Sequence, residues 1–198
     1  MSARRQVVGL CAVIMTASGC VGREPTSNAP DDQVYAAALD SVYGGPGGFS
    51  RLVIQDSTST WFSWPDQDES LAVRLEFHRP RLPGVDARMA GLLIASRSRA
   101  VRIPEALAIR IPYSWMTTSE VRRLVASRGR DWGTFANHNL GTPGITQLSR
   151  VVYSEDGTRA LLYLAEVCMR TCGHGEYITL QRRDRTWVVA GRSQDWVS

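Results

Sequence analysis

The sequence contains no lysine, since all 23 of its basic residues are arginine. This usage is typical of a genome rich in G and C, and no arginine cluster demands bidentate contacts with phosphate. The net charge of +4 would fall to +2 if the first 19 residues were removed, because Arg4 and Arg5 would leave with them. A charge this small and this scattered does not favour nucleic acid as a partner.

Long apolar runs and catalytic motifs are also missing. No segment approaches the 18 apolar residues that a membrane-spanning helix needs. The glycine-rich segment 44–48 is followed by Phe49-Ser50-Arg51, not by the Gly-Lys-Ser/Thr of a phosphate-binding loop, and is interpreted as a turn. No G-x-S-x-G elbow is present, and only His78, His138 and His174 could serve a nucleophile–His–acid triad. We interpret each of the three as a surface or loop residue.

The N-terminus has the layout of an export signal. Arg4 and Arg5 precede the apolar run Val7–Ala17, which spans only about half of a bilayer core of ~30 Å. A short apolar run behind positive charge, ending in small residues, is typical of a cleaved leader. The small residues Ala17-Ser18-Gly19 are followed by Cys20.

This junction resembles the lipobox of bacterial lipoproteins, in which the cysteine receives a diacylglyceryl group and becomes the new N-terminus. The resemblance implies a signal peptide over 1–19 and lipidation at Cys20, although the family favours Leu where Ala17 stands. Ordinary cleavage after Gly19 also fits the small residues. Residues 20–33 are rich in Pro, Ser, Asn and Asp and indicate a flexible tether.

The remainder, 34–198, has the composition of one globular domain. Apolar residues make up 43% and charged residues 21% of the chain, so it can bury a core. In the N-terminal part, the patterns and capping residues predict helices over 34–43, 66–77, 85–95 and 118–127, and strands over 51–56 and 107–112.

The C-terminal part reads as four strands joined by polar turns. The predicted strands cover 144–154, 159–167, 176–182 and 187–190, with Asp156-Gly157 and Asp184 in turns. Segment 168–175 is interpreted as a loop, with the backbone turning at His174 between its two glycines. The predicted fold class is α+β, with helices packed on one face of a C-terminal four-stranded antiparallel meander.

The C-terminal third also resembles a family of uncharacterised exported bacterial proteins, over about residues 129–198. The residues that carry the likeness are Trp132, Phe135, Gly144, Leu148-Ser149-Arg150-Val151, Tyr153, Ala160-Leu161-Leu162-Tyr163, Cys172-Gly173-His174-Gly175, Trp187 and Trp196-Val197-Ser198. The resemblance implies a fold and no catalytic residue.

Cys168 and Cys172 flank a short segment, and exported proteins fold where disulfides persist. Such a pair can reach the ~5.5 Å Cα separation of a disulfide, so we predict one here. Two alternatives remain. With His174 the pair could bind zinc, but a second ligand pair is missing. A reactive dithiol would more typically show the C-x-x-C spacing.

Two further features could contact a ligand. Arg150 lies in a predicted strand, where it could bind a ligand, pair with a carboxylate or cover apolar surface with its stem. Trp61, Phe62 and Trp64 could stack on glycans, although aromatic residues more often fill a core.

Three functions follow from these observations. The first is a lipid-anchored envelope protein that acts as a non-enzymatic interaction or structural module, with an envelope protein as partner. The second is a domain that binds a small ligand or cell-wall fragment between helices and sheet, with Arg150 and His174 as candidate contacts. The third is a hydrolase that uses His138 or His174. No catalytic residue, metal or cofactor is assigned.

Overall fold

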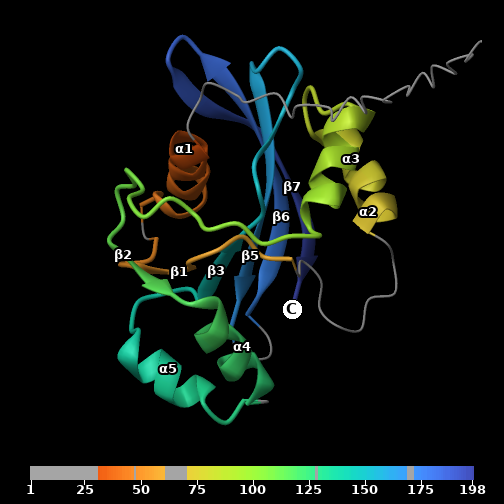
Figure 1. Cartoon of the computed structure of the whole chain (residues 1–198). Helices are drawn as coiled ribbons and strands as arrows, with labels where there is room; N and C mark the ends of the chain where they lie inside the picture. The colour runs from red at the N-terminus through yellow and green to blue at the C-terminus, as the bar shows by residue number, and fades with distance from the viewer. Residues whose placement is uncertain (1–30, 47, 61–70, 128, 169–171) are drawn as a thin grey trace, which may run out of the picture.

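The computed structural model describes residues 31–46, 48–60, 71–127, 129–168 and 172–198 (Figure 1). The predicted leader, Cys20 and the tether up to residue 30 lie outside these residues, as do Trp61, Phe62 and Trp64. The first helix already begins at Asp31, so the last three residues of the predicted tether belong to the folded part.

The described residues form five α-helices and one 3-10 turn. These are α1 (Asp31–Tyr43), α2 (Leu71–His78), η1 (Arg79–Arg81), α3 (Ala87–Ser96), α4 (Thr118–Ala126) and α5 (Trp132–His138). The predicted start of α4 is confirmed, because the Thr117 side chain and Glu120 form a reciprocal capping box. Helix α5 was not predicted, and His138 therefore ends a helix and does not lie in a loop.

One sheet of seven strands organises the described part of the chain. The strands are β1 (Leu52–Gln55), β2 (Tyr113–Met116), β3 (Ile145–Leu148), β4 (Val152–Tyr153), β5 (Arg159–Val167), β6 (His174–Arg183) and β7 (Thr186–Val197). Their order is β2-β1-β3-β5-β6-β7, with β4 paired to β5. The α+β class is confirmed. The sheet is larger than the predicted four-stranded meander. It is also not wholly antiparallel, because β1 runs parallel to both β2 and β3.

Two predicted strands differ from the structure for local reasons. The strand predicted over 144–154 is split into β3 and β4 at Ser149, whose Oγ accepts a hydrogen bond from the Tyr163 backbone at 2.8 Å. The strand predicted over 107–112 is not formed. Pairing with β1 begins instead at the carbonyl oxygen of Pro112, which accepts from Leu52, and continues through β2.

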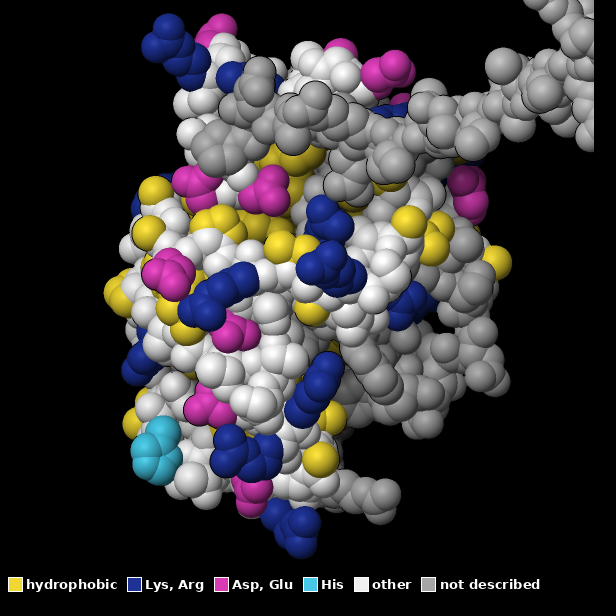
Figure 2. All heavy atoms as spheres, in the orientation of Figure 1, with side chains coloured by type: hydrophobic (Ala, Val, Ile, Leu, Met, Phe, Trp, Pro, Cys, Tyr) yellow, Lys and Arg dark blue, Asp and Glu magenta, His cyan; other side chains and the backbone are white. Residues whose placement is uncertain are grey.

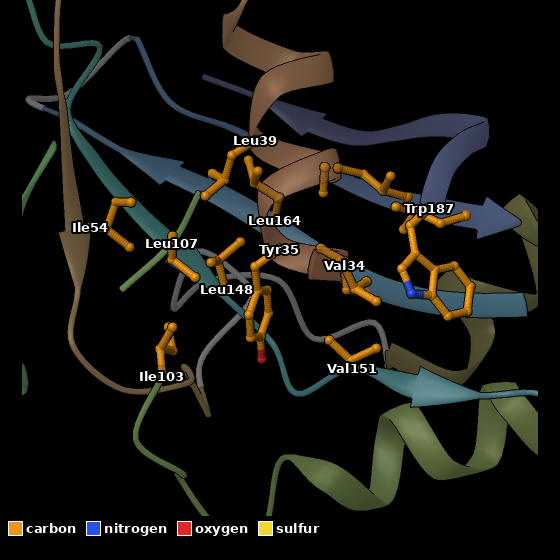
Figure 3. Packing of buried hydrophobic residues seen from close by; sticks show 14 of the residues in the cluster. Val34, Tyr35, Leu39, Ile54, Ile103, Leu107, Leu148, Val151, Leu164 and Trp187 are labelled. Carbon is orange, nitrogen blue, oxygen red and sulfur yellow. The ribbon is translucent and has the colours of Figure 1, made fainter. Parts of the chain in front are cut away.

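Helix α1 covers one face of the sheet. Strand alternation points Leu162 and Leu164 toward this face, where they pack with Tyr35 and Leu39 of α1 (Figure 3). The Tyr35 hydroxyl donates to the Ser149 carbonyl at 2.9 Å, which satisfies a buried polar group in this core.

Helices α2 and α3 cover the opposite face. Leu75 of α2 and Met89 and Leu93 of α3 pack on Tyr163 and Tyr177, which alternate with the residues under α1. Figure 1 shows α1 on one side of β5–β7 and α2 and α3 on the other. The prediction that helices gather on one face is therefore wrong, because β5 and β6 are apolar on both sides and both faces need a cover.

Candidate functional site

Two clusters of histidine and carboxylate side chains lie on opposite faces of the sheet. The pocket cluster consists of Tyr43, Glu166, His174, Glu176 and Arg192, on the face that α1 covers. The buried cluster consists of Arg74, His78, Tyr163, Ser193 and Asp195, on the face that α2 covers.

The β5–β6 hairpin builds the pocket cluster. Glu166 pairs in register with His174, and residues 174 and 176 point to the same face because side chains alternate along a strand. His174 opens β6, which corrects the prediction of a turn at this residue. Gly175 between them is required by close packing, because a Cβ there would overlap Trp196 and Tyr163 on the opposite face.

The imidazole of His174 lies between two buried carboxylates. Its Nδ1 is 3.7 Å from Glu166 Oε2, and its Nε2 is 3.7 Å from Glu176 Oε1. Glu166 is 5% exposed and Glu176 is 3% exposed. Arg192 donates two charge-assisted hydrogen bonds to Glu176, from Nε at 2.7 Å and from Nη2 at 2.8 Å.

These contacts displace the pKa values of the cluster in different directions. The Glu176 carboxylate, helped by Glu166, raises the pKa of His174 above its ordinary value against the opposing effect of burial. Burial raises the pKa of Glu166, and the neighbouring His174 only partly offsets it. Burial would also raise the pKa of Glu176, but His174 and Arg192 outweigh it and hold that pKa low. The cluster therefore retains protons on His174 and Glu166 more readily than separate side chains would.

Helix α1 is fastened to this cluster through its last turn. The Tyr43 hydroxyl donates to Glu166 Oε2 at 3.4 Å and accepts from Thr146 Oγ1 at 3.4 Å. Arg192 Nη1 reaches the Ser41 carbonyl at 3.5 Å. A series of polar contacts therefore runs from Tyr43 of α1 through the cluster and back to Ser41 of the same helix.

A pocket of about 300 Å³ opens over the cluster. The polar groups that face it are His174, Glu176, Arg192 and Gln194. Cys172, Gly173, Val197 and Ser198 complete its lining. This volume is at the small end of the range for ligand sites, and a few convergent polar groups are typical of them. The arrangement can orient a small polar group and exchange a proton with it.

The predicted disulfide is confirmed and borders this pocket. Cys168 and Cys172 are bonded, with their Cα atoms 5.7 Å apart. The bond closes the loop between β5 and β6 just beyond the Glu166–His174 pair. It also engages both sulfurs that the zinc and dithiol alternatives required. Among the residues that the structure describes, no group of three or more His, Cys, Asp and Glu is placed to hold a metal ion.

The buried cluster has the connectivity of a Ser–His–Asp triad. His78 Nδ1 is 2.8 Å from Ser193 Oγ, and His78 Nε2 is 3.3 Å from Asp195 Oδ1. Arg74 Nη1 lies 3.1 Å from Asp195 Oδ2, which also accepts a 2.7 Å hydrogen bond from Tyr163. A β-bulge creates this geometry: Gly175 pairs with Trp196 and Glu176 with Gln194, which leaves Asp195 as the extra residue of β7.

Burial argues against catalysis by this cluster. His78 is 6% exposed and Ser193 is 5% exposed, and the Asp195 side chain is 1% exposed. A triad needs a nucleophile that a substrate can reach. Burial also lowers the pKa of His78, although Asp195 opposes this shift. The cluster instead joins α2 to β7 through buried polar contacts, and the prediction that His78 is a surface residue is wrong.

The structure separates the two candidate contacts named from sequence. His174 lines the pocket, whereas Arg150 lies between β3 and β4, close enough to Asp31 at the start of α1 to stabilise its charge. The pocket adjoins the last turn of the same helix, about 18 Å further along its axis. His138 is exposed at the end of α5 and its Nδ1 contacts the Thr134 carbonyl at 2.7 Å.

Sequence reasoning missed Glu166, Glu176 and Arg192. For Glu166 and Glu176 the sequence signal was a charged residue within a largely apolar strand pattern, as in the run RALLYLAEV of β5. A buried charge is rare unless it is paired, so these positions could have been marked. Their partners could not, because the pairing depends on strand register.

Comparison with known proteins found no matching family model, no similar curated protein and no similar solved structure. None of the helices in the described ranges combines the length and apolar character needed to cross a bilayer. On the face drawn in Figure 2, acidic and basic side chains are interspersed, with no continuous basic surface.

Proposed function

We propose that this chain is an exported lipoprotein of the cell envelope, anchored through Cys20, whose domain is a non-enzymatic interaction module. The module binds a small polar ligand or cell-wall fragment in the pocket over His174. Export, lipidation and membership of the exported family rest on the sequence features of the leader and of residues 129–198.

One observation carries the binding function. The pocket gathers His174, Glu176, Arg192 and Gln194 at an opening of about 300 Å³. By contrast, the triad-like Ser193 on the other face is buried. The accessible polar groups therefore support a binding site, whereas burial closes the triad-like Ser193 to a substrate.

The position of the pocket fits a tethered receptor. Helix α1 starts at Asp31, within the last residues of the tether predicted over 20–33, and its far end contacts the pocket cluster through Tyr43 and Ser41. The ligand site therefore adjoins the end of α1 that is farther from the proposed lipid anchor. We infer that the pocket samples the aqueous side of the envelope.

The anchor is tested by following the protein in cell fractions. A Cys20→Ala variant should lose labelling by radioactive palmitate and leave the membrane fraction, whereas Cys11→Ala should keep both properties. Retention and labelling of the Cys20→Ala variant would exclude a lipid anchor at this residue.

Binding is tested on the isolated exported protein by two-dimensional NMR. Mixtures of small metabolites and of soluble cell-wall fragments should shift the signals of residues 172–176 and 192–198. The double variant Glu176→Gln/Arg192→Gln removes both charges of one ion pair together and should lose the response. His138→Gln, on the exposed end of α5, should respond like the unchanged protein. Shifts confined to other surfaces would contradict a site at this pocket.

A second candidate function is an adaptor that binds a protein partner at the same pocket. The exposed Gln194 at the pocket offers a position for a photo-crosslinking residue. A discrete cross-linked protein, obtained in intact envelopes and lost with Glu176→Gln/Arg192→Gln, would favour the adaptor over the small-ligand binder.

A further inference from the structure

The acceptor groups of the pocket are already engaged. Both oxygens of Glu176 accept from Arg192, and Glu166 lies beneath the site with Tyr43 and His174 as its partners. Of the groups that remain partly exposed at the opening, the Arg192 guanidinium and a protonated His174 are donors only, and the Gln194 amide can also donate. The Arg192 side chain is 40% exposed, the His174 side chain is 25% exposed, and Gln194 is exposed with its amide. Such a lining favours a ligand that accepts hydrogen bonds.

The charges of the cluster also depend on a proton shared within it. Arg192 and Glu176 cancel one another, and Glu166 with His174 makes a neutral pair when it holds one proton. When the pair holds a second proton, His174 is an imidazolium, Glu166 is neutral and the site carries one net positive charge. Both groups have a raised pKa, so the second proton, which goes to Glu166 when His174 is already an imidazolium, is gained more readily than by an ordinary glutamate.

We propose that the pocket binds the carboxylate group of a small ligand, and that the Glu166–His174 pair takes up one proton as this carboxylate enters. The anion and the proton arrive together, so the buried region stays neutral. A low-dielectric site favours this outcome, because an uncompensated charge there is costly. Arg192 and Gln194 supply the hydrogen bonds, and Glu176 keeps Arg192 in place.

The groups that face His174 set the direction of the effect. They are Glu166 on β5, Glu176 on β6 and Arg192 on β7, while Tyr43 of α1 contacts Glu166. Of the two glutamates and the histidine, Glu166 and His174 have raised pKa values, whereas the pKa of Glu176 is lowered. Binding that consumes one proton weakens as the pH rises, by up to about tenfold per pH unit.

The test uses matched acids and amides with the full exported chain. Succinate is compared with succinamide, and N-acetyl-glycylglycine with its C-terminal amide, by titration calorimetry between pH 6 and 8. The acids should bind and the amides should not. The first pair reports recognition of a free acid and the second reports recognition of a peptide terminus. Repeating the titration in buffers of different ionisation enthalpy measures the proton uptake.

Two variants test the proton uptake and the hydrogen-bond donors separately. Glu166→Gln mimics the protonated carboxyl, so it should bind succinate at pH 8 within about threefold of the affinity of the unchanged protein at pH 6. Glu176→Gln/Arg192→Gln should lose at least about tenfold in affinity, the equivalent of one strong hydrogen bond. His138→Gln serves as the control and should match the unchanged protein in both respects.

This inference rests on the proposed binding function, and the outcomes distinguish the two. Equal binding of acid and amide, or preference for a diamine, would overturn the carboxylate assignment, and affinity independent of pH would overturn the proton uptake. Each of these results would leave a ligand site at the pocket. If no compound of any charge shifts the NMR signals around His174, both the inference and the proposed function fail.

Discussion

The two clusters share their chemistry and differ in access. Each places a histidine beside a carboxylate and an arginine against one face of the same sheet, yet the pKa of His78 is lowered and that of His174 is raised. Burial dominates at His78, which α2 covers, whereas the flanking Glu176 and Glu166 dominate at His174 beside an open pocket. The comparison shows that residue types alone do not separate a structural network from a binding site. The two are separated by access to solvent and by the balance between burial and neighbouring charges.

The largest expected effect tests whether the buried cluster is structural. Asp195→Asn removes the charge that Arg74 contacts and should lower the free energy of unfolding by about 3–5 kcal/mol, because it breaks a buried ion pair by removing one partner. Urea denaturation measures the change. The exposed pair Arg102–Glu105 provides the control, since Glu105→Gln should change stability by less than about 1 kcal/mol. Equal effects of the two variants would contradict a structural role for the buried cluster.

The disulfide sharpens the comparison because it borders only one cluster. Cys168→Ser/Cys172→Ser should lower the free energy of unfolding by about 2 kcal/mol, the value for closing so short a loop. In NMR spectra the ring signals of His174 should move, while those of His78 on the opposite face stay in place. A shift of the His78 signals as large as that of His174 would show that the clusters are not independent.

Opposite pH dependences are expected for the two histidines. A raised pKa means that His174 stabilises the fold fully below its ordinary value of 6.5 and loses this contribution as the pH rises through the raised value. A lowered pKa means that the contribution of His78 is present above 6.5 and is lost as the pH falls through the lowered value.

The matched variants are His174→Gln and His78→Gln. The destabilisation caused by His174→Gln should therefore be greater at about pH 5.5 than at about pH 8, and that caused by His78→Gln should show the reverse, each by on the order of 1 kcal/mol. Denaturation at the two pH values measures both slopes. Slopes of the same sign would refute the assignment of opposite shifts.

The last prediction is that Ser193 does not react with a serine-directed reagent. A fluorophosphonate labels serines that an accessible triad activates, and Ser193 is 5% exposed beneath α2. Mass spectrometry should find Ser193 unmodified at neutral pH. Labelling that disappears in His78→Gln would break the comparison, because the buried cluster would then be a gated hydrolase site.

Local sequence patterns predicted much of the fold. The capping residues around Thr117 predicted α4, the apolar run RALLYLAEV after an Asp-Gly turn predicted β5, and the spacing of Cys168 and Cys172 predicted the disulfide. Each depends on contacts between residues near in sequence, where geometry follows from spacing. The export and lipidation inferred from residues 1–20 likewise rest on a local sequence signal, and they stay predictions.

The candidate site depended on contacts that spacing does not reveal. His174 was named from the sequence, but Glu166, Glu176 and Arg192 became its neighbours only through the register of three strands. Ser193 and Asp195 meet His78 because a bulge in β7 and a helix from far along the chain converge on one face.

By itself, the sequence determined the α+β class, several element positions and the disulfide, because these follow from periodicity, capping and chain length between cysteines. Only the tertiary structure decided which histidine is buried and which faces a pocket. That choice depends on which helix covers which face of the sheet, and long-range packing sets the solvent exposure that in turn sets each pKa.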